Sequence, residues 1–289
     1  MIPATPALTL NPLTAFMRQP KIFIRLPSDG KFWAAGSLIP TETNEYPVFS
    51  MTAHDELTLK IPDALMNGQA VVDVIQNCVP NIKNAWEVPS IDMDIILIAI
   101  RIATYGEKLT TPISIGEDEL DYTVDLRNVM DSLMQNITWN EHVVANEELT
   151  IYVKPINYKQ MTQLSVQTFE TQKILQIVNN DTLSEEDKLA AFKDSFNKLT
   201  NVTIGMVTAS IYKIDTPQGS TDNVAFIKEF MDNVDKEIFN SVQDHLEILK
   251  EQNSVKPIII PVTDELREKG HTGDTIEVPL IFDAASFFG

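Results

Sequence analysis

The stretch from Ser90 to Gly106 constrains the fold more than any other part of this sequence. From Ile95 onward its residues are apolar around nearly the whole circumference of a helix, with Arg101 as the charged exception. A surface helix shows a single apolar stripe, so this one has to be enclosed by other protein. It is also shorter than the about 20 apolar residues that cross a bilayer. We therefore expect a central buried helix in a soluble domain, with Arg101 reaching a polar edge or a carboxylate.

The limits of this helix are marked by residues with defined capping roles. Ser90 is predicted as the N-cap, because its hydroxyl can accept an amide proton of the first turn. Asp92 and Asp94 follow where the helix dipole is positive. Gly106 can adopt the left-handed conformation that closes the last turn.

Extended segments accompany the helix. Residues 21–26 and 46–51 predict an N-terminal strand pair, and residues 109–126 alternate by two around an acidic turn, which is typical of a β-ribbon. Residues 256–262 and 275–282 predict a second ribbon. The fold class expected is α+β and helix-rich, with an N-terminal strand pair, a central buried helix and two β-ribbons.

The second half of the chain is predicted to be mainly helical. Asn157 can cap one helix, and the acidic sequence after Ser184 is a variant of the capping box for the next. The spacing of apolar residues extends the second helix through Ile211 to Ile214, and we expect the two helices to form an antiparallel hairpin. One face of the second helix is interpreted as core, and it carries Leu189, Phe192, Phe196 and Leu199.

Two shorter helices are expected after this hairpin, one from near Thr221 and one capped by Asp235. The pattern as a whole divides the chain into three parts. They are an N-terminal arm at 1–20, an N-terminal α+β domain with the first ribbon at 21–150, and a helical region ending in the second ribbon at 151–289.

The charge balance limits the partners. Lys and Arg number 22 against 41 Asp and Glu, a formal net charge of -19. Such a surface repels phosphate and anionic lipid, so no nucleic acid and no membrane is expected. Two interpretations of the excess acid stay open, a solvated surface or docking to a basic protein.

The single Cys78 is expected to be a buried small apolar side chain. Met1–Pro6 lacks a signal-peptide pattern, which favours the cytoplasm.

Sequence motifs for chemistry are lacking. The sequence has no HExxH or CxxC pattern for a metal, no closely spaced glycines for phosphate, and no GxSxG elbow. Acidic pairs such as Glu147-Glu148 and Glu185-Glu186 are interpreted as solvated charge. We therefore expect no catalytic residue, no cofactor and no metal. The four histidines are scattered at His54, His142, His245 and His271.

Several stretches together resemble the baseplate hub and hub-assembly proteins of contractile-tailed phages of the T-even type. They are Arg25–Trp33 leading to Val48–Glu56, then Ile98–Gly106, Phe226–Phe230, Val278–Asp283 and Ser286–Phe288. The resemblance implies a non-enzymatic protein of the central hub, acting as a hub component or as a chaperone of hub assembly. The implied partners are other baseplate hub, tail tube or tape-measure proteins, and a homo-oligomer is left open. The implied location is the host cytoplasm during assembly and the virion tail baseplate.

The resemblance also bears on metal binding. Relatives carry CPxC-type pairs in both ribbons, whereas Thr111–Gly116 and Ile260–Asp264 contain no cysteine. No zinc is therefore expected, and apolar packing would replace it. The side chains proposed for that packing are Ile113, Ile115, Ile258 and Ile260. The alternative function that stays open is a cytoplasmic enzyme whose site the sequence does not reveal.

Two ends of the sequence are expected to supply docking surface. The proline-rich arm 1–20 has too little pattern to fold alone. Phe287 and Phe288 are adjacent aromatic residues, and each gains about 1.5–3 kcal/mol when removed from water. They are predicted to dock into a partner, and the alternative is that they pack back under the final ribbon of the same chain.

Overall fold

The computed structural model of the chain describes residues 13, 16–61, 67–115, 118–135, 139–146, 148–178, 184–264, 267, 273–278 and 287–288. Over these residues the fold is α+β, with small antiparallel sheets and long helices, as the sequence predicts. Most of arm 1–20, the second-ribbon residues 279–282 and His271 lie outside the described residues. No described helix is both long and apolar enough to cross a membrane.

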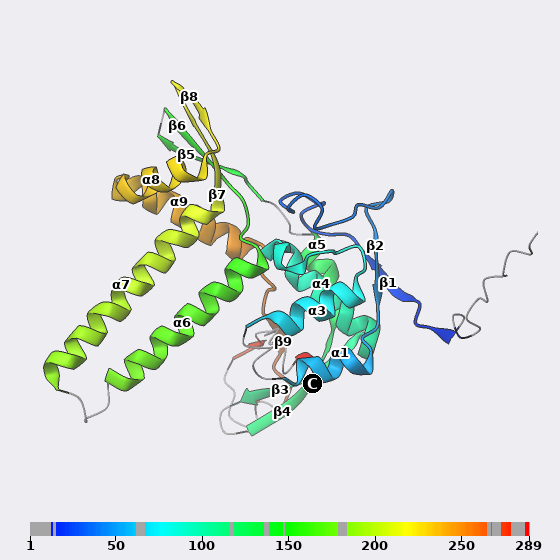
Figure 1. The fold of residues 1–289 in the computed structure, drawn as a ribbon. Coiled ribbons are helices and arrows are strands. Elements are labelled where there is room, and N and C mark those ends of the chain that lie inside the picture. Colours follow the sequence, from blue (N-terminus) through cyan, green and yellow to red (C-terminus); the bar gives the residue numbers. More distant parts are fainter. Residues whose placement is uncertain are drawn as a thin grey trace, which may run out of the picture.

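Helix α4 (Ser90–Tyr105) lies at the centre of the N-terminal core, which confirms the predicted buried helix (Figure 1). Ile96, Ile98 and Ile100 are each fully buried. The predicted strand pair is confirmed, because β1 (Pro20–Ile24) and β2 (Tyr46–Phe49) pair antiparallel beside this helix. Helices α3 (Gln69–Cys78) and α5 (Leu126–Gln135) also contact α4, while α1 (Ala53–Leu59) and the short 3-10 helix η2 (Ala85–Glu87) contribute other residues to the same core.

The start of α4 differs from the prediction by one residue. Pro89 occupies the N-cap position and Ser90 is already helical, so Ser90 as the N-cap is wrong. The reason is an extended pairing: Ser90 N donates to Ile156 O at 2.8 Å and Tyr158 N donates to Val88 O at 2.9 Å. The helix ends at Gly106 as predicted, and Gly106 N donates to Ile102 O, but its φ of 91° and ψ of 179° are not the predicted left-handed helical conformation.

Asp92 is the buried polar group of this core. Its carboxylate accepts from Ser28 N at 2.7 Å, Ser28 Oγ at 2.5 Å and Trp33 Nε1 at 2.8 Å. Burial raises the pKa of Asp92 to about 6, although these donors act in the opposite direction. The carboxylate thus ties the loop that follows β1 to the first turn of α4. The sequence placed Asp92 at the helix start but gave no sign of these partners.

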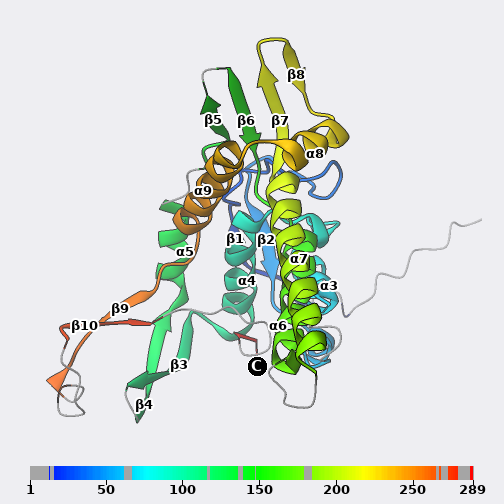
Figure 2. The same ribbon diagram turned by 90° about the vertical axis from the view of Figure 1, so that its left-hand side faces the viewer.

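The two predicted ribbons are present. Strands β3 (Lys108–Ile115) and β4 (Asp118–Asp125) form the first, and helix α5 (Leu126–Gln135) follows it. Strands β9 (Ile258–Pro261) and β10 (Thr275–Val278) form the second. The partly buried Tyr122 of the first ribbon packs against Ile260 and Val262, so the two ribbons are in contact (Figure 2).

A second core lies in the part of the chain that follows. Strands β5 (His142–Asn146), β6 (Leu149–Val153), β7 (Ile211–Thr216) and β8 (Gly219–Thr221) form a four-stranded antiparallel sheet in that order. Helices α8 (Val224–Asn233) and α9 (Lys236–Gln252) pack with it, burying Ile227, Val242 and Leu249. Strand β5 was not predicted. The boundary predicted at 150 stays a prediction, and β5 and β6 pair across it.

The predicted continuation of a helix through Ile214 is wrong. Helix α7 (Glu185–Ser210) ends at Ser210, and the next residues form β7 between β6 and β8. Ile211 and Ile214 are buried, so they satisfy the apolar pattern as strand residues. Their β-branched side chains favour a pleated surface, and the open edge of β6 supplied hydrogen-bond partners that local spacing could not reveal.

Helices α6 (Tyr158–Val178) and α7 form the predicted antiparallel hairpin (Figures 1 and 2). The base of α6 is held by a stacked pair, Trp86 and Tyr158, whose ring centroids are 5.6 Å apart. Gly68 allows this close approach: its φ is 80°, and a Cβ there would lie 2.9 Å from Thr162 Oγ1. The predicted cap is also confirmed, because Gln160 N donates to Asn157 Oδ1 at 3.0 Å.

Replacing Ile98 by Asp is expected to unfold the N-terminal core. The side chain is fully buried, and an unpaired carboxylate there costs several kcal/mol, comparable with the stability of a whole domain. Thermal unfolding followed by circular dichroism measures the effect. The control is Leu57→Asp on α1, where the side chain is 65% exposed. An Ile98→Asp protein that melts like the control would contradict the central position of α4.

Replacing Asp94 by Asn is expected to raise stability at neutral pH. Burial raises the pKa of Asp94 from 3.8 to about 6. A carboxyl with a raised pKa favours the folded state while it is protonated, and this contribution is lost as the pH rises through about 6. The neutral amide avoids that loss, so the variant should be more stable than the native protein by about 1–3 kcal/mol at pH 8.

Urea unfolding at pH 8 and pH 5 tests this expectation. The difference in the free energy of unfolding between Asp94→Asn and the native protein should be about half as large at pH 5 as at pH 8. At pH 5 the native carboxyl takes up its proton in the folded state. Asp244→Asn, at an exposed position of α9, is the matched control. An advantage that does not change with pH would show that the burial of Asp94 does not set its titration.

Candidate protein-protein interface

The structure brings none of the described histidines into a metal site. His54, His142 and His245 lie on α1, β5 and α9, and no group of three or more His, Cys, Asp or Glu is close enough for a metal among the described residues. Cys78 is fully buried, as predicted, and burial raises the pKa of its thiol to about 12. A thiol in that state is a poor nucleophile.

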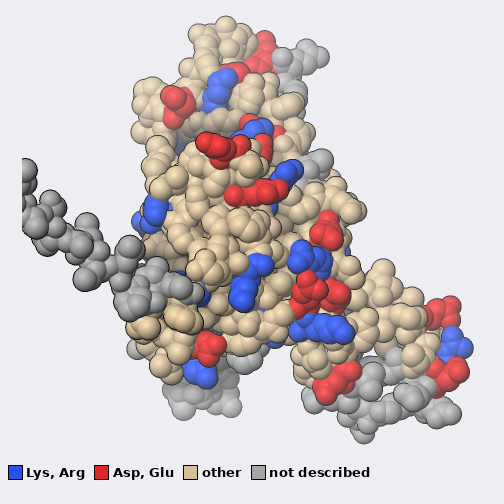
Figure 3. Space-filling model, turned by 90° about the vertical axis from the view of Figure 1, so that its right-hand side faces the viewer, with Lys and Arg blue, Asp and Glu red and all other residues tan. Residues whose placement is uncertain are grey.

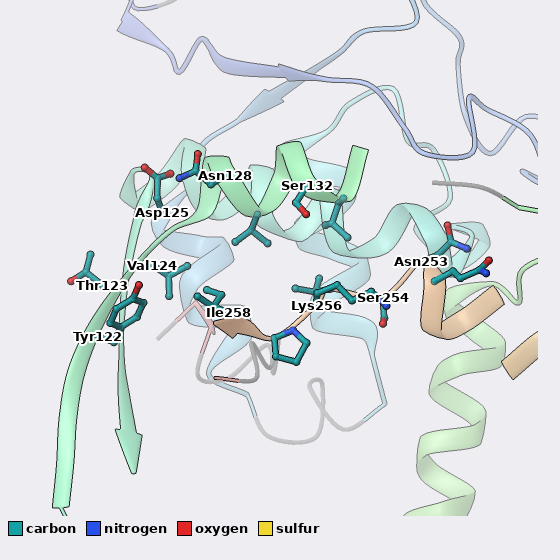
Figure 4. A pocket seen from close by; sticks show the side chains of 15 residues that line it. Tyr122, Thr123, Val124, Asp125, Asn128, Ser132, Asn253, Ser254, Lys256 and Ile258 are labelled. Atoms are coloured by element: carbon teal, nitrogen blue, oxygen red, sulfur yellow. The ribbon is translucent and has the colours of Figure 1, made fainter. Parts of the chain in front are cut away.

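A pocket of about 360 Å³ lies between β4, α5 and the segment that leads from α9 to β9 (Figure 4). Its charged lining residues are Asp125 and Lys256. Both make local contacts, since Asp125 Oδ1 accepts from Arg127 N at 2.9 Å and Lys256 Nζ donates to Glu251 O. The other polar lining groups are hydroxyls and amides, so the pocket does not pair a nucleophile with a base.

Two open grooves run along α6. One of about 570 Å³ lies between α6 and α7, and one of about 720 Å³ lies between α6 and the N-terminal core. Gln163 and Gln167 line both grooves. Their walls consist mainly of amide and apolar side chains, which suits contact with a polypeptide better than acid-base chemistry.

The feature that stands out is an apolar stripe on α7. Leu189, Phe192 and Phe196 follow each other at intervals of three and four, so they share one face of the helix. The sequence pattern predicts a core face, and this prediction is wrong for these residues: they are 57%, 50% and 62% exposed. Leu199 has no described side-chain environment. We call these three residues the α7 stripe.

The neighbouring helix and the charges beside the stripe extend this surface. On α6, Val166 is 36% and Phe169 is 42% exposed. Helical spacing places Lys188 and Lys193 on opposite flanks of the α7 stripe. A periodic row of exposed large apolar residues on a projecting hairpin is typical of an interface with another protein.

Phe287 and Phe288 are not exposed. They are 2% and 5% exposed and lie in the N-terminal core of the same chain. The structure therefore agrees with the alternative of packing within the chain, although they pack against the end of α4 and not only under the ribbon. Docking of this pair to a partner stays a proposal.

The described part of the arm is exposed but anchored at one point. Leu13, Phe16 and Met17 are 63%, 86% and 53% exposed. Arg18 holds the arm to the body, because it donates to Ser50 O at 2.6 Å and to Asn77 O at 2.8 Å. The exposed apolar residues lie before this anchor in the described part of the arm.

On the face that Figure 3 shows, charges do not gather into one field. On the face in Figure 3, acidic and basic side chains are interspersed over the body, with large uncharged areas between them. The exposed ion pairs Arg25–Glu45 and Arg127–Glu107 each place opposite charges side by side. The excess of acidic residues, a net charge of -19, therefore does not form a single acidic binding surface on this face.

The fold and these surfaces define an α+β protein with exposed apolar residues on a projecting helical hairpin and on the described part of an N-terminal arm. The family model of the T4 bacteriophage base plate protein matches residues 19–288, and the chain belongs to this family. It is therefore a T4-type phage baseplate protein, and its family associates it with the tail baseplate and with other phage structural proteins. Comparison with curated proteins and with solved structures found no match.

Shortening the α7 stripe is expected to leave the fold intact. Phe192→Ala and Phe196→Ala should each change the free energy of unfolding by less than about 1 kcal/mol, because the side chains are exposed. The matched control on the same helix is Val207→Ala, where the side chain is 5% exposed. That change should cost about 1.5–3 kcal/mol. Urea unfolding measures all three, and a loss at Phe192 as large as at Val207 would show that the stripe is covered within the chain.

Proposed function

We propose that the chain acts in baseplate and tail assembly through protein-protein contacts, as a hub component or as a chaperone of hub assembly. The observation that supports this most is the exposed α7 stripe. Its spacing over two helical turns fits a groove or a facing helix on another protein. The proposed partners are other baseplate hub, tail tube or tape-measure proteins, met in the host cytoplasm during assembly.

We further propose that this function needs no catalysis. The described pocket next to α5 offers hydroxyls, amides and two charged groups already engaged with neighbouring atoms. Acyl or phosphoryl transfer would need a positioned nucleophile, base or metal there. Docking needs only a surface that excludes water on contact, and the α7 stripe supplies one.

The proposal is tested with phage that carry Phe192→Ser and Phe196→Ser together. The variant protein should accumulate in folded form, while the yield of complete tails falls at least tenfold, because the contact has lost its apolar centre. Electron microscopy of lysates and plaque counts measure the two results. The control is Leu57→Ser, at another exposed apolar residue. Normal tails from the double variant would contradict docking through this stripe.

Mass spectrometry of purified virions, compared with lysate, separates the two forms of the proposal. A hub component should be retained at a fixed number of copies per particle. A chaperone should be abundant in the lysate and absent from the particle.

A further inference from the structure

The last turn of α4 carries a slot that holds Phe287 and Phe288 through their main chain. Arg101 Nη1 donates to the carbonyl oxygen of Phe287, and Tyr105 Oη donates to that of Phe288 at 3.0 Å. Burial and the nearby Glu56 raise the pKa of Tyr105, so the hydroxyl stays protonated and able to donate. Two side chains one helical turn apart on α4 thus donate hydrogen bonds to two consecutive main-chain carbonyls.

The slot also makes contacts that suit aromatic side chains. The rings of Phe287 and Phe288 lie edge to face with centroids 5.1 Å apart, inside the N-terminal core. The Arg101 guanidinium lies 5.1 Å from the centre of the Tyr105 ring and 5.2 Å from that of Phe287. Hydrogen bonds to main-chain carbonyls combined with contacts to aromatic side chains are how proteins recognise short peptide segments.

We propose that this slot is a peptide-binding site whose occupant can be exchanged, so that the Phe287–Phe288 pair of a second copy of this chain takes the place of the chain's own pair and joins the two copies. Every copy carries both the slot and its ligand. An exchanged pair makes the same contacts as the pair seen within one chain, and such swapping is a low-cost route to an oligomer. The inference is independent of the α7 stripe.

The chain length sets a geometric condition on this exchange. The pair is joined to the end of β10 by residues 279–286, a stretch that spans at most about 30 Å. Within one chain this short link gives the pair a high effective concentration at its own slot. Exchange therefore requires copies held close together, as in an assembled baseplate, or a high protein concentration.

Photo-cross-linking of the full chain tests the exchange. The photoreactive residue p-azidophenylalanine replaces Phe288 and keeps an aromatic ring in the slot. Protein grown on ¹⁴N and protein grown on ¹⁵N are mixed, incubated at low and high concentration, and irradiated. Mass spectrometry then identifies the cross-linked peptides. The same replacement at Phe226, which is 61% exposed on α8, is the control.

We expect cross-links from position 288 to the peptide that contains Arg101 and Tyr105, with a mixed-isotope fraction that rises at least fivefold with concentration. The control position should give no cross-link to this peptide. Same-isotope cross-links at every concentration would overturn the exchange, and the absence of any cross-link to α4 would overturn the slot itself. Melting temperatures confirm that each protein is folded.

Sedimentation velocity of proteins without the photoreactive residue gives a second readout. Exchange predicts a dimer at high concentration for the native chain and at least a tenfold smaller dimer fraction for Phe287→Ala combined with Phe288→Ala. If the double variant is folded and dimerises as the native chain does, the pair does not join copies.

Discussion

The whole N-terminal part of the structure depends on the need to bury α4 on all sides. A helix that is apolar around its circumference cannot be stabilised by one neighbouring layer, and it therefore collects cover from several directions. The β1–β2 pair, α3, α5 and the base of α6 each contact it. Polar residues near its two ends hold other segments by hydrogen bonds: Asp92 binds the loop after β1, and Arg101 binds the Phe287–Phe288 pair.

Helix α7 shows the opposite outcome of a similar sequence pattern. Leu189, Phe192 and Phe196 have the periodicity of a core face, yet this chain does not cover them. Periodicity reports that a helix has an apolar face and is silent on which molecule covers it. In a member of a baseplate family, where structural proteins contact one another, an uncovered face of this kind fits an interface between proteins.

The two aromatic features differ in what they can do for assembly. The α7 stripe is exposed on a projecting hairpin, outside the two cores of the chain. The Phe287–Phe288 pair is enclosed within the N-terminal core, where it contributes to the same packing that surrounds α4. Docking through the α7 stripe would add a partner without changing the fold of this chain. Exchange of the Phe287–Phe288 pair would instead replace part of the N-terminal core of one copy by residues of another.

The sequence by itself determined the α+β class, the buried helix, the strand pair, both ribbons and the α6–α7 hairpin, because local periodicity and capping residues carry that information. Tertiary structure alone decided the rest. Ile211 and Ile214 became strand residues because β6 had an open edge, and Ser90 moved inside α4 because residues near Val88 pair with those near Tyr158. The partners of Asp92 and Arg101 lie 64 and 186 residues away along the chain, a separation that no local pattern can encode.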